Sequence, residues 1–102
     1  MGREEFRDYY ESYHRLIGED VVGPYALRYV RRYLLPLDGE DRDFDFDVMT
    51  ETDFANEATM ERFFDSIGEP DVAQRISEDE TRLFDTSRIR SFRVDREEVS
   101  KL

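Results

Sequence analysis

Apolar and polar positions along this chain follow two periods, and the changes between them mark the predicted elements. Apolar side chains three or four residues apart indicate an amphipathic helix, whereas strict alternation indicates a strand with one buried face. The first segment, REEFRDYYESYHRLI, repeats its aromatic residues at helical spacing. The predicted elements are a helix over 3–17, strands over 25–35 and 46–54, helices over 56–67 and 70–84, and a strand over 87–95.

Residues that stop or cap helices support these bounds. Gly18 is predicted to end the first helix, because glycine is common just past a helix C-terminus. Asn56 is suited to accept hydrogen bonds from the first free N–H groups of a helix, and Pro70 suits a first helical position. Residues 77–80, SEDE, have the form of a capping box, so we expect a break there and a new helical turn.

The order of the elements is the ferredoxin-like βαββαβ pattern without its first strand. We therefore expect an α+β fold formed by a single domain over residues 1–102. The missing strand is central in that fold, so its absence would leave unpaired backbone on two neighbours. We expect either that the gene product extends upstream and supplies this strand, or that a partner or a rearranged sheet fills the position.

The charge balance narrows the choice of partners. Charged residues make up 40% of the chain, and the formal net charge is −11. A phosphate backbone or an anionic membrane would be repelled by this field, so nucleic acid and membranes are not expected partners. No window approaches the roughly 18 apolar residues of a membrane span, and no apolar signal region is recognised, so we expect a cytoplasmic protein.

The basic residues are almost entirely arginine, with Lys101 as the single lysine. Two explanations remain open: adaptation to a salty cytoplasm, where carboxylates keep a protein hydrated, and a GC-rich genome that favours arginine codons. The chain has no cysteine, which excludes disulfides and thiolate metal sites. It also has no glycine-rich dinucleotide fingerprint, so neither a redox cofactor nor a metal is expected.

The candidate catalytic residues are His14, Tyr10 and Glu51. His14 is the only histidine, a residue type that changes its charge near neutral pH, and it lies one helical turn beyond Tyr10. It is expected to act as a general acid or base, with a half-buried helix histidine bonded to a carboxylate as the alternative. Tyr10 is expected to orient the imidazole or to donate to a developing oxyanion, with core packing as the alternative. Glu51 is the expected carboxylate partner of His14, with a salt bridge to an arginine as the alternative.

The candidate substrate-binding residues are Arg31, Arg32, Tyr29 and Tyr13. Arg31 and Arg32 lie on opposite faces of the predicted strand, so one of them must point toward the interior or a dimer cavity. That arginine is suited to hold a carboxylate or an enolate, or alternatively to form an ion pair within this acidic protein. Tyr13 and Tyr29 are expected to form the walls of the cleft. A further acidic group, Asp79, Glu80 and Asp85, is interpreted as capping and structural, with catalysis as the alternative.

Several of these stretches together resemble the EthD family of small dimeric α/β-barrel proteins. The first helix matches a Y-Y-E-x-x-H pattern through Tyr9, Tyr10, Glu11 and His14. Glu51 and Phe54 match the end of the third family strand, and a D-E-x-x-F-x-D pattern is approached by residues 79–85. The likeness extends from about residue 3 to residue 94. Asp53 departs from the family, which commonly has an aromatic residue there, and Met1 would fall at the junction after the family's opening strand.

The resemblance implies a homodimer in which two four-stranded sheets face each other, with a cleft between sheet and helices. Family members are linked to the oxidative breakdown of ethers, and relatives resemble polyketide dehydratases, decarboxylases and cyclases. Two hypotheses follow. The chain is either a cofactor-free acid/base enzyme acting on an aromatic or polyketide-like molecule, or a non-catalytic accessory protein that binds an aromatic or apolar ligand in an oxidative pathway. An open pocket at His14, shared with Glu51 or an arginine, would favour the enzyme, whereas a packed core would favour the accessory protein.

Overall fold

The computed structural model describes residues 2–43 and 45–102, so Met1 and its expected junction position lie outside the described part. Helices combine with one antiparallel hairpin, which confirms the α+β class. The elements are α1 (Arg3–Tyr9), the π-helical segment η1 (Tyr10–His14), α2 (Arg15–Val22), β1 (Ala26–Tyr33), β2 (Val48–Phe54), α3 (Glu57–Ile67), α4 (Pro70–Leu83) and the 3-10 turn η2 (Thr86–Arg88).

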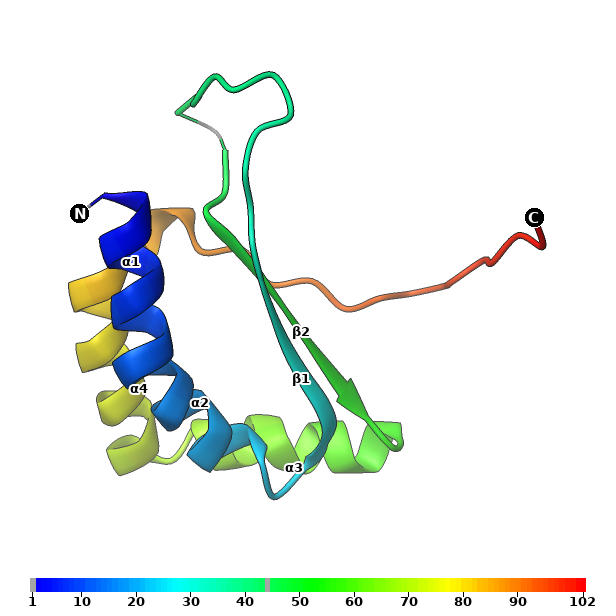
Figure 1. Ribbon diagram of the computed structural model, residues 1–102. Coiled ribbons are helices and arrows are strands. Elements are labelled where there is room, and N and C mark those ends of the chain that lie inside the picture. The colour runs from blue at the N-terminus through cyan, green and yellow to red at the C-terminus, as the bar shows by residue number, and fades with distance from the viewer. Residues whose placement is uncertain (1, 44) are drawn as a thin grey trace.

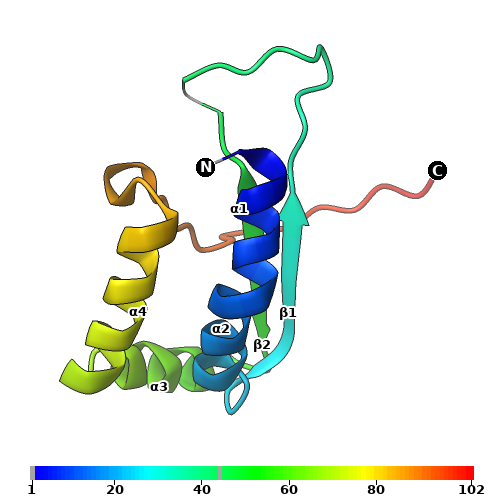
Figure 2. The same ribbon diagram turned by 60° about the vertical axis from the view of Figure 1, so that its left-hand side comes forward.

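The helices form a layer on one side of the hairpin (Figures 1 and 2). α1, η1 and α2 form one continuous rod, and α4 lies beside it in both views. α3 crosses the end of the hairpin at which β2 finishes. The long connection between the strands projects beyond the helices, and the C-terminal segment leaves the domain (Figure 1).

The hairpin is in a regular antiparallel register from Tyr33 opposite Val48 to Arg28 opposite Asp53, with an irregularity between Ala26 and Arg28. Side chains alternate between the two faces of such a ribbon. The side chains of Arg31 and Tyr33 contact the helical rod through Glu11, so the face that carries Tyr29, Arg31 and Tyr33 is the one turned toward the helices.

Phe6, Tyr10 and Leu83 form the central cluster of the buried apolar core. These residues join α1 and η1 to α4, and partly buried side chains pack around them, namely Tyr9, Tyr33, Val48 and Phe84. Phe6 contacts both Tyr10 and Phe84 in tilted or edge-on geometry, with ring centroids 6.1 and 5.9 Å apart. The core is small for a chain of this length, so each of its residues carries a large share of the stability.

The first helix does not end at Gly18, as the sequence predicts, but continues to Val22. Gly18 lies inside α2, and the Tyr29 hydroxyl packs directly against it. A Cβ atom at this position would lie 2.6 Å from that hydroxyl. Glycine is therefore present here to admit a side chain from the hairpin, and a close tertiary contact produces the same sequence feature as a helix terminus.

The helix break predicted at residues 77–80 is also wrong, because α4 runs without interruption from Pro70 to Leu83. Ile76, Asp79 and Leu83 lie on one face of α4 at helical spacing, and the burial of Asp79 and Leu83 against the first rod favours a continuous helix. The predictions for α3 hold closely. Asn56 caps it by accepting a hydrogen bond of 2.8 Å from the Thr59 backbone N–H.

The strands are shorter than predicted, and the last one is absent. The predicted strand over 25–35 forms only at Ala26–Tyr33, and the one over 46–54 only at Val48–Phe54. Within the described residues, the segment 87–95 begins in the turn η2 and then continues without regular structure. Alternation alone does not make a strand, because backbone hydrogen bonds to a neighbouring strand are required as well.

Candidate functional site

His14 lies at the end of η1, the π-helical segment in the middle of the first rod. The hydrogen bond from the Arg15 backbone N–H to the Tyr10 carbonyl spans five residues, one more than in an α-helix. Such single π-turns are rare and are frequent at functional sites. Tyr10 and His14 are the two buried residues of this segment.

The partner of the His14 imidazole is Asp79 of α4. The ring Nδ1 lies 2.5 Å from the Asp79 Oδ2, and both side chains are almost completely buried. The other carboxylate oxygen accepts a hydrogen bond of 2.9 Å from the Tyr9 hydroxyl. Because both carboxylate oxygens are used, the buried charge of Asp79 is compensated on each side.

The hydrogen bond to Asp79 determines which nitrogen of the ring remains for chemistry. A carboxylate accepts the Nδ1–H, so the neutral imidazole has its lone pair on Nε2. No fully buried side-chain nitrogen or oxygen in the described residues lacks a hydrogen-bond partner, and the contact found for this ring is through Nδ1. We therefore infer that Nε2 keeps access to solvent while Nδ1 is fixed.

Aromatic rings hold the imidazole from two sides. The ring of Tyr10 lies 4.7 Å from His14 and that of Phe84 lies 5.4 Å away, both edge-on. Glu80 lies nearby and is half-buried. Burial raises the pKa of the Glu80 carboxyl above its ordinary value, although attraction to His14 opposes this shift. The surroundings of His14 are thus a packed aromatic core with one acidic side.

Glu51 does not meet His14, so the predicted pairing of these two residues is wrong. Glu51 accepts a hydrogen bond of 3.0 Å from the Arg32 guanidinium. It lies opposite Val30 in the hairpin, one position away from the pairs whose side chains face the helices, so it points away from the rod. The alternative of a surface salt bridge therefore describes both Glu51 and Arg32.

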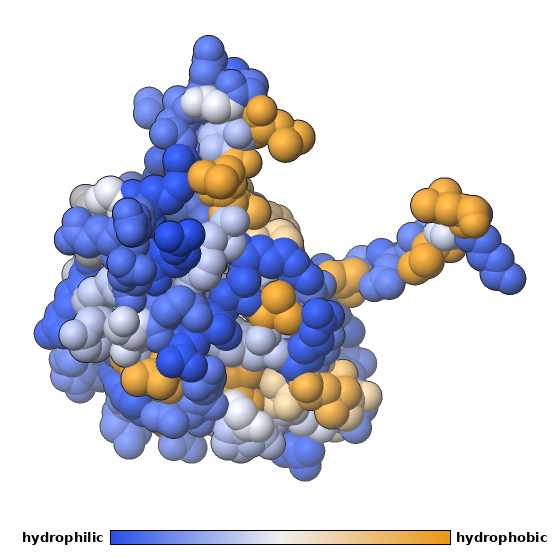
Figure 3. Space-filling model, viewed as in Figure 1, coloured by the Kyte–Doolittle hydropathy of each residue, from blue (hydrophilic) through white to orange (hydrophobic). Residues whose placement is uncertain are grey.

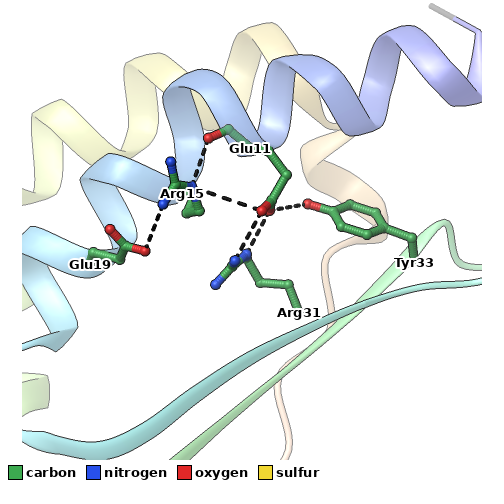
Figure 4. Close-up of polar contacts among 5 residues, drawn as sticks. All are labelled: Glu11, Arg15, Glu19, Arg31 and Tyr33. Atoms are coloured by element: carbon green, nitrogen blue, oxygen red, sulfur yellow. Dashed lines mark hydrogen bonds and ion pairs between the residues drawn. The ribbon is translucent and has the colours of Figure 1, made fainter.

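Arg31 is the arginine that faces the interior, but a carboxylate of the chain already holds it (Figure 4). Its Nε donates to Glu11 Oε2 at 2.6 Å, and a terminal nitrogen donates to Oε1 at 3.0 Å. The Tyr33 hydroxyl donates to the same Oε2 at 2.6 Å, and Arg15 approaches Oε1 at 3.8 Å. The Arg31 hydrogen bonds hold the pKa of Glu11 below its ordinary value despite partial burial.

Tyr10 contacts the imidazole, and Tyr29 contacts the Arg31 guanidinium. Burial raises the pKa of Tyr10 well above that of a free phenol, and the neighbouring Tyr29 adds to the shift. Burial likewise raises the pKa of Tyr29, whose ring lies 5.4 Å from the Arg31 guanidinium. Both phenols therefore remain neutral donors. Tyr13 is 60% exposed and packs on Tyr9, so it forms no wall of an enclosed cleft.

Two clefts of the described surface lie away from His14, which lines neither of them. A small one of about 150 Å³ lies between the end of α2 and the start of β1, with Tyr29 in its wall. A larger one of about 560 Å³ lies where the start of α1 meets the inter-strand connection. Its lining is mostly charged and consists of Gly2, Arg3, Phe6, Asp41, Arg42, Asp43, Asp45, Asp47 and Arg88.

Sequence reasoning favoured a structural role over catalysis for Asp79, and gave Glu11 no role beyond its match to the family pattern. Asp79 shares a helical face with Ile76 and Leu83, and an acidic residue at an apolar position is the pattern that could have indicated a buried partner. Glu11 stands within the Y-Y-E-x-x-H run itself. No group of three or more histidine or acidic side chains in residues 2–43 and 45–102 is arranged to hold a metal ion.

Two packed helices over an antiparallel hairpin, joined by a histidine–aspartate pair, define an α+β domain of the ferredoxin-like type. The chain belongs to the EthD family, because the EthD domain matches residues 1–87. No curated protein and no solved structure was found to match it. In the part of the chain that the structure describes, no helix is long and apolar enough to cross a membrane.

Proposed function

We propose that this EthD-family chain is a cofactor-free acid/base enzyme in which His14 transfers a proton on an aromatic or polyketide-like small molecule. The observation that carries the proposal is the contact of 2.5 Å between His14 Nδ1 and Asp79 Oδ2. A carboxylate in this position fixes the tautomer and stabilises the imidazolium that forms when the other nitrogen accepts a proton.

The proton moves through Nε2. The neutral ring takes a proton from a carbon beside a carbonyl, and the imidazolium returns it to the product or to a leaving hydroxyl. Dehydration, decarboxylation and cyclisation of polyketide-like molecules each include such a transfer. The neutral phenol of Tyr10, 4.7 Å from the ring, keeps the imidazole in place and is a donor rather than a base.

A second candidate function is supported by the packing around His14. The ring is held by Tyr10 and Phe84, and neither cleft reaches it. This is the arrangement expected for a non-catalytic protein that binds a ligand in an oxidative pathway. The cleft of about 560 Å³ has a volume within the range of small-molecule sites, about 300 to 1,000 Å³, and Phe6 contributes an apolar wall.

A general-base probe separates the two functions. Nitrobenzisoxazole opens to a coloured phenolate when one proton is removed, so its absorbance reports proton abstraction without any cofactor. The wild type should accelerate the opening, and His14→Gln should lose about 10²- to 10⁴-fold of that acceleration. Asp79→Asn should lose most of it, whereas Asp20→Asn, at a surface ion pair with Arg75, should match the wild type.

If His14→Gln opens the probe as fast as the wild type, the acid/base proposal is wrong. Thermal-shift measurements with a panel of aromatic acids then test the binding protein. A ligand that stabilises wild type and His14→Gln equally, but not Phe6→Leu, would locate binding in the cleft beside Phe6.

A further inference from the structure

The π-helical segment η1 is held between two different elements of the fold. At its end, the His14 ring contacts Asp79 of α4. Near its start, the Glu11 carboxylate contacts Arg31 and Tyr33 of β1. Residues three apart lie on the same side of an α-helix, whereas more residues share each turn of a π-helix, so such side chains diverge further around the axis. The π-turn therefore suits a segment in which Glu11 and His14 contact different neighbours.

The Glu11 carboxylate anchors η1 to the hairpin. Both of its oxygens accept hydrogen bonds from Arg31, at 2.6 and 3.0 Å, and one also accepts the Tyr33 hydroxyl at 2.6 Å (Figure 4). Two charge-assisted bonds to one guanidinium fix the orientation of a carboxylate as well as its position. Burial raises the pKa of Tyr33, and the hydrogen bond to Glu11 adds to the shift, so this phenol stays a neutral donor. Figure 3 shows a mainly hydrophilic surface between the first rod and the hairpin, which polar contacts of this kind join.

Glu11 also receives a contact at its backbone. The Arg15 backbone N–H donates to the Tyr10 carbonyl, instead of to the Glu11 carbonyl that an α-helix would offer it. The side chain of the same arginine replaces that bond, because its Nε donates to the Glu11 carbonyl at 2.8 Å. Uncommon backbone geometry persists where the surrounding contacts determine it. Here those contacts converge on Glu11, through its carbonyl and through its carboxylate.

A second connection runs from Glu11 to His14 through aromatic rings. Tyr33, whose hydroxyl is bonded to Glu11, packs edge-on against Tyr10 with ring centroids 5.7 Å apart. Tyr10 in turn packs edge-on against the imidazole at 4.7 Å. Side chains in a close-packed interior transmit displacements to their neighbours. A change in the position of the Tyr33 ring therefore changes the space left for Tyr10 and for the imidazole.

We propose that Glu11 is a positioning residue, whose contacts with β1 hold the π-turn in the form that places His14 Nδ1 against Asp79. Asp79 fixes the ring itself, and Glu11 fixes the segment that carries the ring. Glu11 acts on proton transfer through the imidazole and needs no contact with the substrate. The effect on catalysis rests on the proposed function, whereas the effect on the position and tautomer of the ring does not.

The first test compares two glutamates of the same rod in the nitrobenzisoxazole assay. Glu11→Gln keeps the size of the side chain but removes the charge that faces Arg31, and it should lower kcat about ten- to a hundredfold with little change in KM. Glu19→Gln is the matched control, because it removes the charge of another partner of Arg15 and should match the wild type. Both variants are assayed at a temperature at which circular dichroism shows them to be folded.

The second test observes the ring directly and requires no catalysis. In alkaline buffer, the long-range ¹H–¹⁵N NMR spectrum of the single histidine should show the Nδ1–H form in the wild type and in Glu19→Gln. Glu11→Ala should give a mixture with the Nε2–H form. This variant leaves Arg31 and Tyr33 without their acceptor, so added sodium formate should bind between them and restore the Nδ1–H form. Sodium chloride at the same ionic strength should not.

The two tests separate this inference from the proposed function. If the wild type does not open the probe, but Glu11→Ala changes the ring spectrum and formate reverses the change, the proposed function is wrong and the positioning role of Glu11 is supported. The inference itself is overturned if Glu11→Ala leaves the spectrum unchanged, or if formate does not reverse the change. It is also overturned if the wild type opens the probe and Glu11→Gln opens it equally fast.

Discussion

His14 and Asp79 are 65 positions apart in the sequence, yet the imidazole Nδ1 and the carboxylate Oδ2 lie 2.5 Å apart. The pair joins the π-helical segment of the first rod to the C-terminal half of α4. It therefore ties together the two helices that enclose the core, and in the proposed enzyme it also fixes the ring for proton transfer.

The structural role predicts that Asp79→Asn destabilises the protein. In asparagine an NH2 group, which donates but does not accept, replaces one of the two carboxylate oxygens, so either the His14 ring or the Tyr9 hydroxyl loses its acceptor. We expect a loss of about 1–3 kcal/mol in the free energy of unfolding, measured by urea denaturation. Asp20→Asn, at an exposed ion pair, should change it by less than about 0.5 kcal/mol. Equal stability of the two variants would contradict a buried pair.

Gly18→Ala is expected to destabilise the protein even though alanine is the better helix former. The new Cβ atom would lie 2.6 Å from the Tyr29 hydroxyl and 3.1 Å from the ring carbon that bears it. Overpacking of this kind costs about 1–3 kcal/mol, which exceeds the gain of about 1 kcal/mol in helix propensity. The double variant with Tyr29→Phe should recover part of the loss. If Gly18→Ala is more stable than the wild type, the Tyr29 hydroxyl does not pack against Gly18.

Protonation of Glu11 is predicted to destabilise the protein at low pH. Its pKa is lowered in the folded state, chiefly by hydrogen bonds from Arg31, so the folded protein releases this proton more readily than the unfolded chain. Stability from this group is fully present above the ordinary value near 4.5 and is lost as the pH falls through the folded pKa. In urea titrations, Glu11→Gln should flatten the pH dependence below that value, whereas Glu97→Gln in the exposed tail should not.

Glu80 is predicted to lower the stability of the protein as the pH rises, which is the reverse of the effect of Glu11. Burial raises its pKa, so the folded state binds this proton more tightly and stability falls as the pH rises from the ordinary value near 4.5 through the folded pKa. Glu80→Gln removes the buried charge and should raise the unfolding free energy at neutral pH relative to the wild type. A decrease would mean that attraction to His14 outweighs the burial of the carboxylate.

The sequence predicted those features that depend on local patterns. The helical spacing placed Tyr10 and His14 one turn apart, and their rings indeed lie 4.7 Å from each other. Asn56 caps α3 as expected, and both the α+β class and the EthD family are confirmed.

The predictions that are wrong concern features that depend on contacts between distant segments. Gly18 was interpreted as a helix stop because the sequence does not show that Tyr29 packs on it. Residues 77–80 satisfy the capping-box pattern, but burial of Asp79 against the first rod keeps the helix continuous. Glu51 is the carboxylate that the sequence predicts as the partner of His14, but the register of the hairpin turns it to the opposite face, toward Arg32.

The central claim is that Asp79, rather than Glu51, fixes the His14 ring with its proton on Nδ1. Because the chain has a single histidine, one long-range ¹H–¹⁵N NMR spectrum of the ring in alkaline buffer reports its tautomer without assignment. The wild type and Glu51→Gln should both show the Nδ1–H form, and Asp79→Asn should lose that preference. An Nε2–H tautomer in the wild type, or a spectrum that responds to Glu51→Gln but not to Asp79→Asn, would contradict the account.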